Sequence, residues 1–162
     1  MKIKCLIAAM LCLALIGASQ FLLRAQPRTS PNPRQEPTAT ELRSVWEGVY
    51  TEEQAKRGEE LYRKQCSACH GDMLTGGESA PALSGGAFLS NWNGLTVGDL
   101  FDRIRKTMPL GTPGKLTRQQ NADILAFVFR VNKFPSGKTE LQNKTEFLKE
   151  ILFEAFKPEP KK

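Results

Sequence analysis

The chain has 162 residues, of which 40% are hydrophobic and 25% are charged, so it is long enough for one small globular domain with extensions. Its formal net charge is +6, but half of that charge comes from Lys2, Lys4 and Arg24, in a leading segment that contains no acid. No basic stripe is interleaved with aromatic residues, which argues against binding to nucleic acid.

Residues 1–25 have the pattern of an export signal. A positively charged start is followed by an apolar run from Cys5 to Ile16, and cleavage after Ala25 or Ala18 fits the preference for small residues. An uncleaved membrane anchor is the alternative, because residues 3–23 supply about the 20 residues that span a bilayer. Both readings predict a periplasmic or exported protein, either soluble or anchored to the outer face of the cytoplasmic membrane.

The leader is followed by a change in composition. Residues 26–43 are rich in proline and polar side chains, which predicts a flexible linker. Residues 44–158 have the composition of a folded domain with a C-terminal extension, and residues 159–162 are expected to fray.

Three helices are predicted, each after a threonine that can cap it. They follow Thr51, Thr96 and Thr117, and the first and third end near Gln65 and Asn132. Gln54 and Gln120 each stand three residues after a capping threonine, which predicts capping boxes at the first and third helices.

Two segments give weaker predictions. The stretch from Gly71 to about Asn93 is interrupted by glycine and proline and is predicted to be loop. From Phe147 to Phe156 the apolar residues fit a helical stripe, although an extended path across the domain stays open.

The strongest functional signal is the run Cys66-Ser67-Ala68-Cys69-His70. Two thiols at positions i and i+3, with a histidine directly after the second, are the attachment signature of a c-type haem. On a helical turn both sulfur atoms lie on one face and can reach the two vinyl groups of one porphyrin, while His70 points at the iron. We therefore expect one covalent haem c, held by Cys66 and Cys69, with His70 as a metal ligand.

Two other kinds of site use similar runs. A structural zinc site requires about four Cys or His ligands, but His70 is the only histidine, and Cys5 and Cys12 lie in the leader. A redox-active cysteine pair belongs to a βαβ pattern, which the sequence lacks. The run therefore favours haem.

Met108 is the candidate for the sixth iron ligand. It stands in the Pro- and Gly-rich stretch 107–114 rather than on a helix face, where a methionine would fill a core. Met73 is too close to His70 in sequence to reach the opposite face of a haem, and Met1 and Met10 lie in the leader. A sixth position that is open or bound to water is the alternative.

With these motifs in order, residues 44–135 resemble a class I cytochrome c. The resemblance implies an all-α fold, the small cytochrome c fold of three main helices around one covalently bound haem. It implies that Cys66 and Cys69 form the thioether bonds and that His70 and Met108 are the axial ligands.

The resemblance also implies supporting roles for other residues. Pro81 is similar to the proline whose carbonyl accepts the second N–H of the proximal histidine. Trp92 is similar to an indole that hydrogen-bonds a haem propionate. Gly58 and Tyr62 on the first helix would cross Ile124 and Phe127 on the last, and a glycine inside a helix, which costs on the order of 1 kcal/mol, fits such a close approach.

A narrower similarity bears on function. Ser44–Gly58, the Met108 loop and residues 135–141 are similar to small cytochromes associated with quinoprotein (PQQ-dependent) dehydrogenases. This implies an electron-transfer protein rather than an enzyme, which accepts electrons from a periplasmic dehydrogenase and passes them to a respiratory acceptor. The alternatives are a permanently bound haem subunit that docks through residues 147–156, and a haem enzyme or gas-binding protein with an open sixth site.

The distribution of charge suggests how a partner binds. The stretch 103–118 contains five cations and no acid, so a loop at the haem edge would form a basic lip that attracts an acidic docking surface. An ordinary solvated face is the alternative. The five cations are Arg103, Arg105, Lys106, Lys115 and Arg118.

Overall fold

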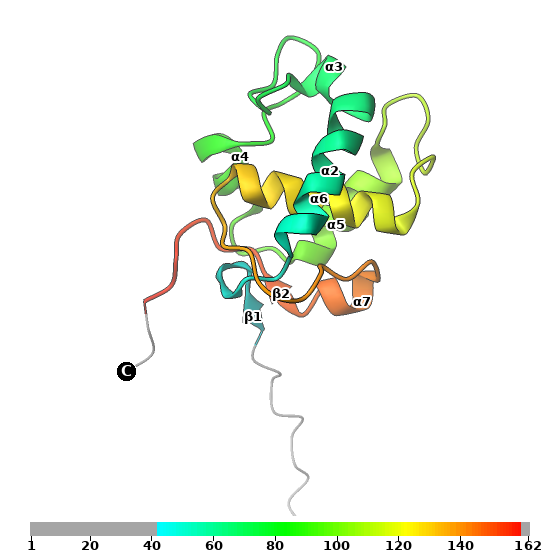
Figure 1. The fold of residues 1–162 in the computed structure, drawn as a ribbon. Helices are drawn as coiled ribbons and strands as arrows, with labels where there is room; N and C mark the ends of the chain where they lie inside the picture. The colour runs from blue at the N-terminus through cyan, green and yellow to red at the C-terminus, as the bar shows by residue number, and fades with distance from the viewer. Residues whose placement is uncertain (1–41, 160–162) are drawn as a thin grey trace, which may run out of the picture. The chain divides into compact units, whose positions relative to one another are not determined.

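The computed structural model describes residues 42–159, and within them the fold is mostly helical, as predicted. The predicted leader, nearly all of the predicted linker and the last three residues lie outside the described residues. The elements in chain order are β1 (Arg43–Ser44), a 3-10 turn η1 (Val45–Glu47), α2 (Glu52–Gln65), α3 (Ser67–His70), α4 (Gly85–Trp92), α5 (Val97–Thr107), α6 (Arg118–Val131), α7 (Thr145–Leu148) and β2 (Ile151–Leu152) (Figure 1).

The three predicted helices are α2, α5 and α6, and each begins after the predicted threonine. The hydroxyl of that threonine accepts a hydrogen bond from a backbone N–H in the first helical turn, at 3.2 Å for Thr51 and at 3.1 and 3.2 Å for Thr96 and Thr117. The predicted capping box is complete at Thr117 but not at Thr51. Gln54 is buried there and bonds instead to Asp123 and to both backbone groups of Leu141.

The centre of the domain is the crossing of α2 and α6 (Figure 1). A Cβ atom on Gly58 would fall on the backbone carbonyl of Asp123, so only glycine allows the two helices to approach this closely. One turn further along α2, the ring of Tyr62 packs against Phe127 with centroids 5.3 Å apart. The predicted close approach at Gly58 is thus confirmed.

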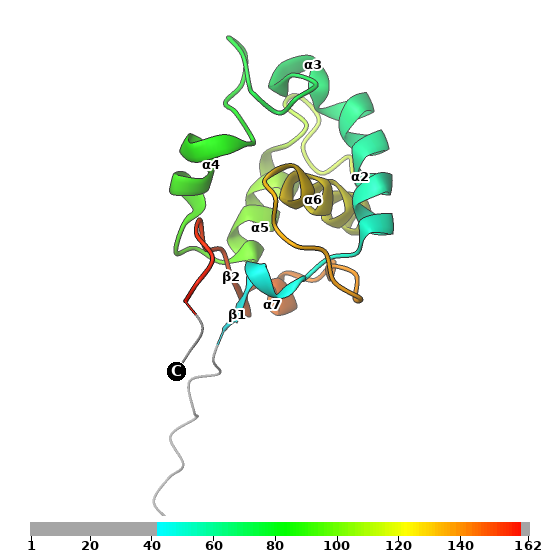
Figure 2. The same cartoon turned by 60° about the vertical axis from the view of Figure 1, so that its left-hand side comes forward.

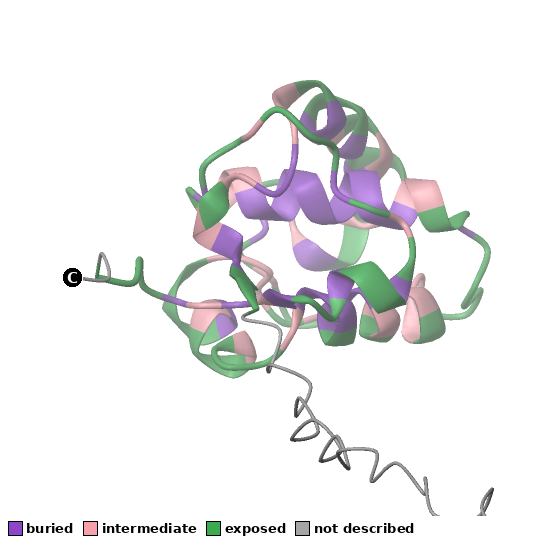
Figure 3. Ribbon diagram, turned by 90° about the horizontal axis from the view of Figure 1, so that it is seen from below, coloured by how far each residue is buried: buried purple, intermediate pink, exposed green. Residues whose placement is uncertain are grey.

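Helix α6 forms the core of the domain. Residues 121–129 are all buried, and Figure 3 shows this as a continuous purple stretch through the middle of the ribbon. In Figure 2, α6 lies between α4 and α2. Among residues 42–159, no helix is both long enough and apolar enough to cross a membrane.

The prediction of loop from Gly71 to Asn93 is wrong for its second half, which forms α4. Gly85 and Gly86 are poor helix formers but stand in the first turn, and tertiary packing compensates for them. Phe88 is buried edge-on against Phe153, with centroids 6.0 Å apart. The N–H of Gly85 donates to the side chain of Asn132, the residue that follows α6, and this gives α4 an N-terminal hydrogen bond that the side chain of Ser84 does not supply.

The helical stripe predicted for residues 147–156 is also wrong, and the extended alternative is correct. After the single turn of α7, the chain pairs in parallel with β1, with Arg43 opposite Ile151 and Ser44 opposite Leu152. Ile151, Phe153 and Ala155 are buried, and the residues between them are only partly so, which is the alternation of a strand. Phe147 and Phe156 remain exposed.

Candidate haem-binding site

The Cys66–His70 run forms one helical turn, as its spacing predicts. The backbone N–H groups of Cys69 and His70 donate to the carbonyl of Cys66, at 3.2 and 3.0 Å, at the junction of α2 and α3. Residues i and i+3 of such a turn lie on one face, so the two thiols are presented together. Both cysteines are free, and burial, followed by the neighbouring Cys69, raises the pKa of the Cys66 thiol to about 11.

His70 is buried and its ring orientation is set by Pro81. Its Nδ1 lies 2.8 Å from the carbonyl oxygen of Pro81. A carbonyl can only accept, so Nδ1 carries the hydrogen and Nε2 keeps the lone pair that binds a metal. This is the arrangement that the family resemblance implies for a proximal histidine.

The loop after His70 is folded tightly enough to bring Pro81 back to it. The N–H of Gly76 donates to the carbonyl of His70 at 2.9 Å, and a Cβ atom on Gly76 would lie 2.5 Å from the backbone nitrogen of Ala82. Gly76 also has a φ of +73°, which disfavours any other residue. This role was not predicted from the sequence, where its one signal is a Gly-Gly pair four residues before a proline.

Tyr62 ties the same loop to α2. Its hydroxyl donates to the carbonyl of Gly71 at 2.7 Å. Burial, with smaller contributions from the charges of Cys66 and Asp72, raises the pKa of Tyr62 to about 12. The phenol therefore stays protonated and keeps this hydrogen bond at all physiological pH values.

The six predicted site residues line one pocket of about 570 Å³, the size of pockets that hold cofactors, which is roughly 300–1,000 Å³. The remaining lining is largely apolar and comes from α4, α5 and α6, including Phe88, Leu100, Ile104, Ile124 and Val128. Two thiols, an imidazole and a thioether within an apolar pocket fit a covalently attached haem. The six predicted residues are Cys66, Cys69, His70, Pro81, Trp92 and Met108.

Met108 lies directly after α5, where its N–H donates to the carbonyl of Ile104 at 2.8 Å. Its neighbours Pro109 and Leu110 also line the pocket. Met73, by contrast, is 73% exposed and does not line it. Of these two methionines, only Met108 is placed to contact a ligand in the pocket.

Trp92 lines the pocket from the end of α4, and its indole Nε1 makes no hydrogen bond within residues 42–159. Arg103, on α5, also lines the pocket. Among the described residues that line it, Arg103 is the one with a permanently charged side chain. The charge pattern of the sequence predicts Arg103 on an outer basic lip and does not indicate that the side chain borders the pocket. Within the same residues, no three His, Cys, Asp or Glu side chains are grouped so that they could hold a metal ion.

Comparisons with known proteins found a matching family model and a similar solved structure. Residues 53–128 match the family model described as cytochrome C oxidase, cbb3-type, subunit III. Over these residues, just under half of its length, the chain is similar to a cytochrome c domain. The matched span runs from α2 to α6 and contains all six residues named above, and a cytochrome c domain implies electron transfer through covalently bound haem c.

A comparison with curated proteins gave no match. Among solved structures, the chain is similar to a chain of the sulfane dehydrogenase SoxCD from Paracoccus pantotrophus, at 21% identity and a TM-score of 0.47. The similarity covers 76% of this chain and 66% of that chain, just under two thirds of its length.

The basic stretch 103–118 contains fewer unpaired cations than its sequence suggests. Asp102, one residue before it, pairs with Lys106 at 2.7 Å and with Arg105 at 3.4 Å. Burial alone would raise the pKa of Asp102, but hydrogen bonds from Lys106 and Thr145, with the charge of Lys106, lower it to about 2. Of the five cations, the three that enter no ion pair within residues 42–159 are Arg103, Lys115 and Arg118, all exposed.

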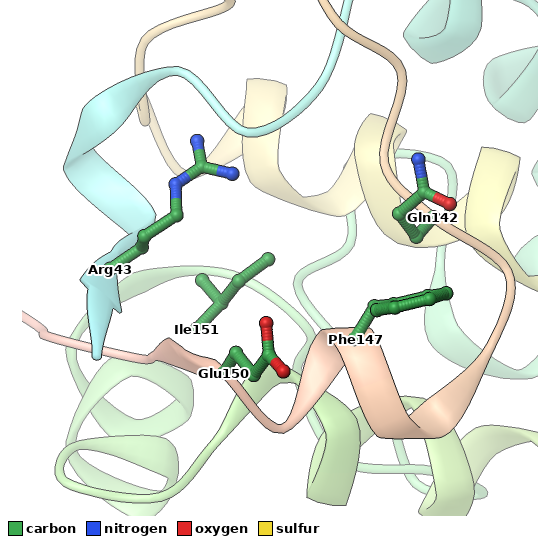
Figure 4. A pocket seen from close by; sticks show the side chains of 5 residues that line it. All are labelled: Arg43, Gln142, Phe147, Glu150 and Ile151. Atoms are coloured by element: carbon green, nitrogen blue, oxygen red, sulfur yellow. The ribbon is translucent and has the colours of Figure 1, made fainter. Parts of the chain in front are cut away.

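A second, smaller pocket lies between β1, α7 and β2 (Figure 4). Phe147 forms part of its wall and is about half exposed, with the Lys144 ammonium 5.8 Å from the centre of its ring. The pocket is shallow and contains no predicted site residue. Its lining is Arg43, Gln142, Phe147, Glu150 and Ile151.

Proposed function

We propose that this protein is a cytochrome c, a one-electron carrier whose single haem c is ligated by His70 and Met108. The observation that carries the proposal is the His70–Pro81 hydrogen bond in a pocket that both cysteines and Met108 also line. A single haem is supported by the sequence, which contains one histidine. When bound, haem c supplies a reversible ferric–ferrous couple, and a methionine ligand together with burial raises its reduction potential.

The residues of the pocket each contribute to that task. Cys66 and Cys69 hold the group covalently on one face of a helical turn, and Pro81 fixes the tautomer of His70. Apolar side chains such as Leu100 and Val128 exclude water. A haem held by His70 and Met108, with no position left for a substrate, would rearrange little when an electron arrives, which suits a carrier rather than an enzyme.

The proposed donor is a periplasmic dehydrogenase of the quinoprotein (PQQ-dependent) type, and the proposed acceptor belongs to a respiratory chain. Both follow from the similarity of Ser44–Gly58 and of the Met108 loop to cytochromes that serve such dehydrogenases. We further propose that the cytochrome works outside the cytoplasmic membrane, either soluble or anchored through residues 3–23. The charged start and apolar run of residues 1–25 support export.

The proposed docking surface for an acidic partner is formed by Arg103, Lys115 and Arg118. These cations border the pocket or the loop that follows Met108, and all three are exposed. Opposite charges at such a surface raise the rate of encounter and orient the partner.

The visible spectrum of the matured ferric protein, with and without the change Met108→Ala, tests the proposal. The unchanged protein is expected to show the weak charge-transfer band of methionine-ligated ferric haem, and the variant to lose this band while the haem stays covalently attached. An unchanged protein that lacks the band would overturn the carrier proposal in favour of a haem enzyme or gas-binding protein with an open sixth site.

The second candidate is a haem subunit held permanently in a larger oxidoreductase complex. The exposed Phe147 beside the shallow pocket and the 83% exposed Phe156 favour it, because the other apolar side chains of the tail are turned into the domain. Co-purification with a large subunit, abolished by Phe147→Ser, would support this candidate. A cytochrome that is purified alone from its native host would exclude it.

A further inference from the structure

Helix α6 carries an asparagine near each end, and each asparagine holds a loop that borders the haem pocket. At the start of the helix, Nδ2 of Asn121 donates to the carbonyls of Leu116 and Thr117, at 3.2 and 2.8 Å. At its end, Nδ2 of Asn132 donates to the carbonyl of Leu83 at 3.0 Å, and its Oδ1 accepts from the N–H of Gly85. Asn121 thus holds the loop after Met108, and Asn132 the loop after Pro81.

Asn121 is fully buried, and its Oδ1 has no hydrogen-bond partner within residues 42–159. A buried, unpaired amide oxygen lowers stability, and an apolar side chain of similar size would avoid that cost. The two hydrogen bonds from Nδ2 are therefore the interactions that an amide supplies at this position and a leucine does not.

The loop between α5 and α6 is fastened at its two ends. At the first end, the N–H of Met108 bonds to the carbonyl of Ile104 at 2.8 Å. At the second, Leu116 is buried and held by Asn121. Between them the loop makes only local turns and is exposed, with Leu110 at 83%. The fastening at Leu116 therefore limits how far the loop can move away from the pocket.

We propose that Asn121 is a positioning residue that keeps the loop 108–117 closed and so holds Met108 at the iron. The inference rests on the proposed function, in which Met108 is the sixth ligand. Thioether sulfur is a soft ligand that ferric iron binds weakly, so the equilibrium between a closed and an open loop decides how much of the ferric protein is methionine-ligated. Asn121 shifts that equilibrium toward the closed loop.

The test compares Asn121→Leu with its matched control Asn132→Leu in the haem-loaded ferric protein. Each change removes one side-chain amide at an end of α6, fully buried for Asn121 and partly buried for Asn132, so both are expected to lower the melting temperature. The charge-transfer band and the affinity for added imidazole separate them. Asn121→Leu is expected to raise the imidazole affinity at least fivefold and to weaken the band, whereas Asn132→Leu leaves both near the values of the unchanged protein.

A milder variant keeps the test decisive if Asn121→Leu fails to fold. In Asn121→Ser the hydroxyl can still bond to the carbonyl of Thr117, four residues earlier, so an intermediate imidazole affinity is expected. An affinity equal to that of the unchanged protein in either Asn121 variant, or an equal rise in Asn121→Leu and Asn132→Leu, would overturn the inference.

Met108→Ala, measured in the same way, separates a failure of the proposed function from a failure of the inference about Asn121 alone. If the unchanged protein binds imidazole as tightly as Met108→Ala, Met108 is not the ligand and the proposed function fails, and the inference fails with it. If the unchanged protein binds imidazole much more weakly than Met108→Ala and the Asn121 variants behave like the control, only the inference fails.

Discussion

Nδ1 of His70 donates to the carbonyl oxygen of Pro81 over 2.8 Å, and the two residues are brought together by a loop that turns back on itself at Gly76. This hydrogen bond fixes which nitrogen of the imidazole faces a metal and makes the ring a stronger electron donor. The proximal side of the site thus depends on the path of a loop, and not only on the Cys66–His70 turn.

Replacing Gly76 with alanine is expected to disturb that hydrogen bond. The new Cβ would lie 2.5 Å from the nitrogen of Ala82, and the φ of +73° would cost roughly another 1 kcal/mol. A weaker hydrogen bond makes the imidazole less basic, so the reduction potential should rise. Potentiometry of the haem-loaded variant measures this shift.

Gly77→Ala is the control for this prediction. A Cβ atom there would meet only the carbonyl of Cys69, at 4.0 Å, and the backbone of Gly77 is not in the left-handed region. Its potential should match that of the unchanged protein. Equal potentials in both variants would show that Gly76 does not position Pro81.

Two glycine substitutions, one at the crossing of α2 and α6 and one on α4, are expected to change the free energy of unfolding in opposite directions. Gly58→Ala would push the helices apart at the carbonyl of Asp123 and should destabilise the protein by about 3 kcal/mol, the upper end of the usual cost of an overpacked core. Gly86→Ala on α4 meets nothing within 4 Å and should stabilise it by roughly 0.5–1 kcal/mol through higher helix propensity. Urea unfolding of the haem-loaded proteins measures both, and a Gly58→Ala variant of unchanged stability would contradict the crossing.

The predictions that the sequence supported were the ones with local causes. Thr51, Thr96 and Thr117 cap helices through contacts three residues away, and the Cys66–His70 spacing places both thiols on one turn. The predictions that were wrong concerned segments whose structure depends on contacts with distant parts of the chain. Helix α4 depends on the packing of Phe88 against the C-terminal segment.

Residues 147–156 show the same limit of prediction from local sequence. Its apolar residues fit both a helical stripe and an alternating strand, and the choice is made by pairing with β1, about 110 residues earlier in the chain. Asn121 and Gly76 were missed for a similar reason, because their roles depend on which loop lies beside them. The sequence predicted haem contacts for Cys66, Cys69, His70 and Met108, which stay predictions. Of the residues that hold these in place it predicted Pro81, but not Gly76 or Asn121.

Asp102 predicts a dependence of stability on pH. Its pKa is lowered from 3.8 to about 2, so its ionised form stabilises the fold above about pH 4, and this contribution is lost as the pH falls toward 2. Relative to Asp102→Asn, the unchanged protein should be more stable by on the order of 1 kcal/mol at pH 7. Urea unfolding of both proteins between pH 7 and pH 2 measures the difference, which should vanish at the acid end.

Thr145→Val is the control for this prediction, because Thr145 donates to Asp102 at 2.7 Å but does not itself titrate. In that variant Lys106 and Arg105 still pair with Asp102, so most of the pH dependence should remain. A difference between the unchanged protein and Asp102→Asn that stays constant from pH 7 to pH 2 would contradict the assignment.

The proposed docking surface predicts that the position of a charge matters more than its sign alone. Lys115→Glu reverses an exposed cation beside the Met108 loop that enters no ion pair within residues 42–159, whereas Lys106→Glu would also place like charges beside Asp102. Lys138→Glu makes the same change in net charge next to Gly137, which bonds to Tyr50 outside the haem pocket.

Electron transfer with an acidic partner should slow roughly threefold to tenfold in Lys115→Glu at low salt and much less in Lys138→Glu. Stopped-flow rates should converge near 1 M salt, where the Debye length falls to about 3 Å. Equal slowing in both variants would show that net charge, and not this surface, governs the encounter.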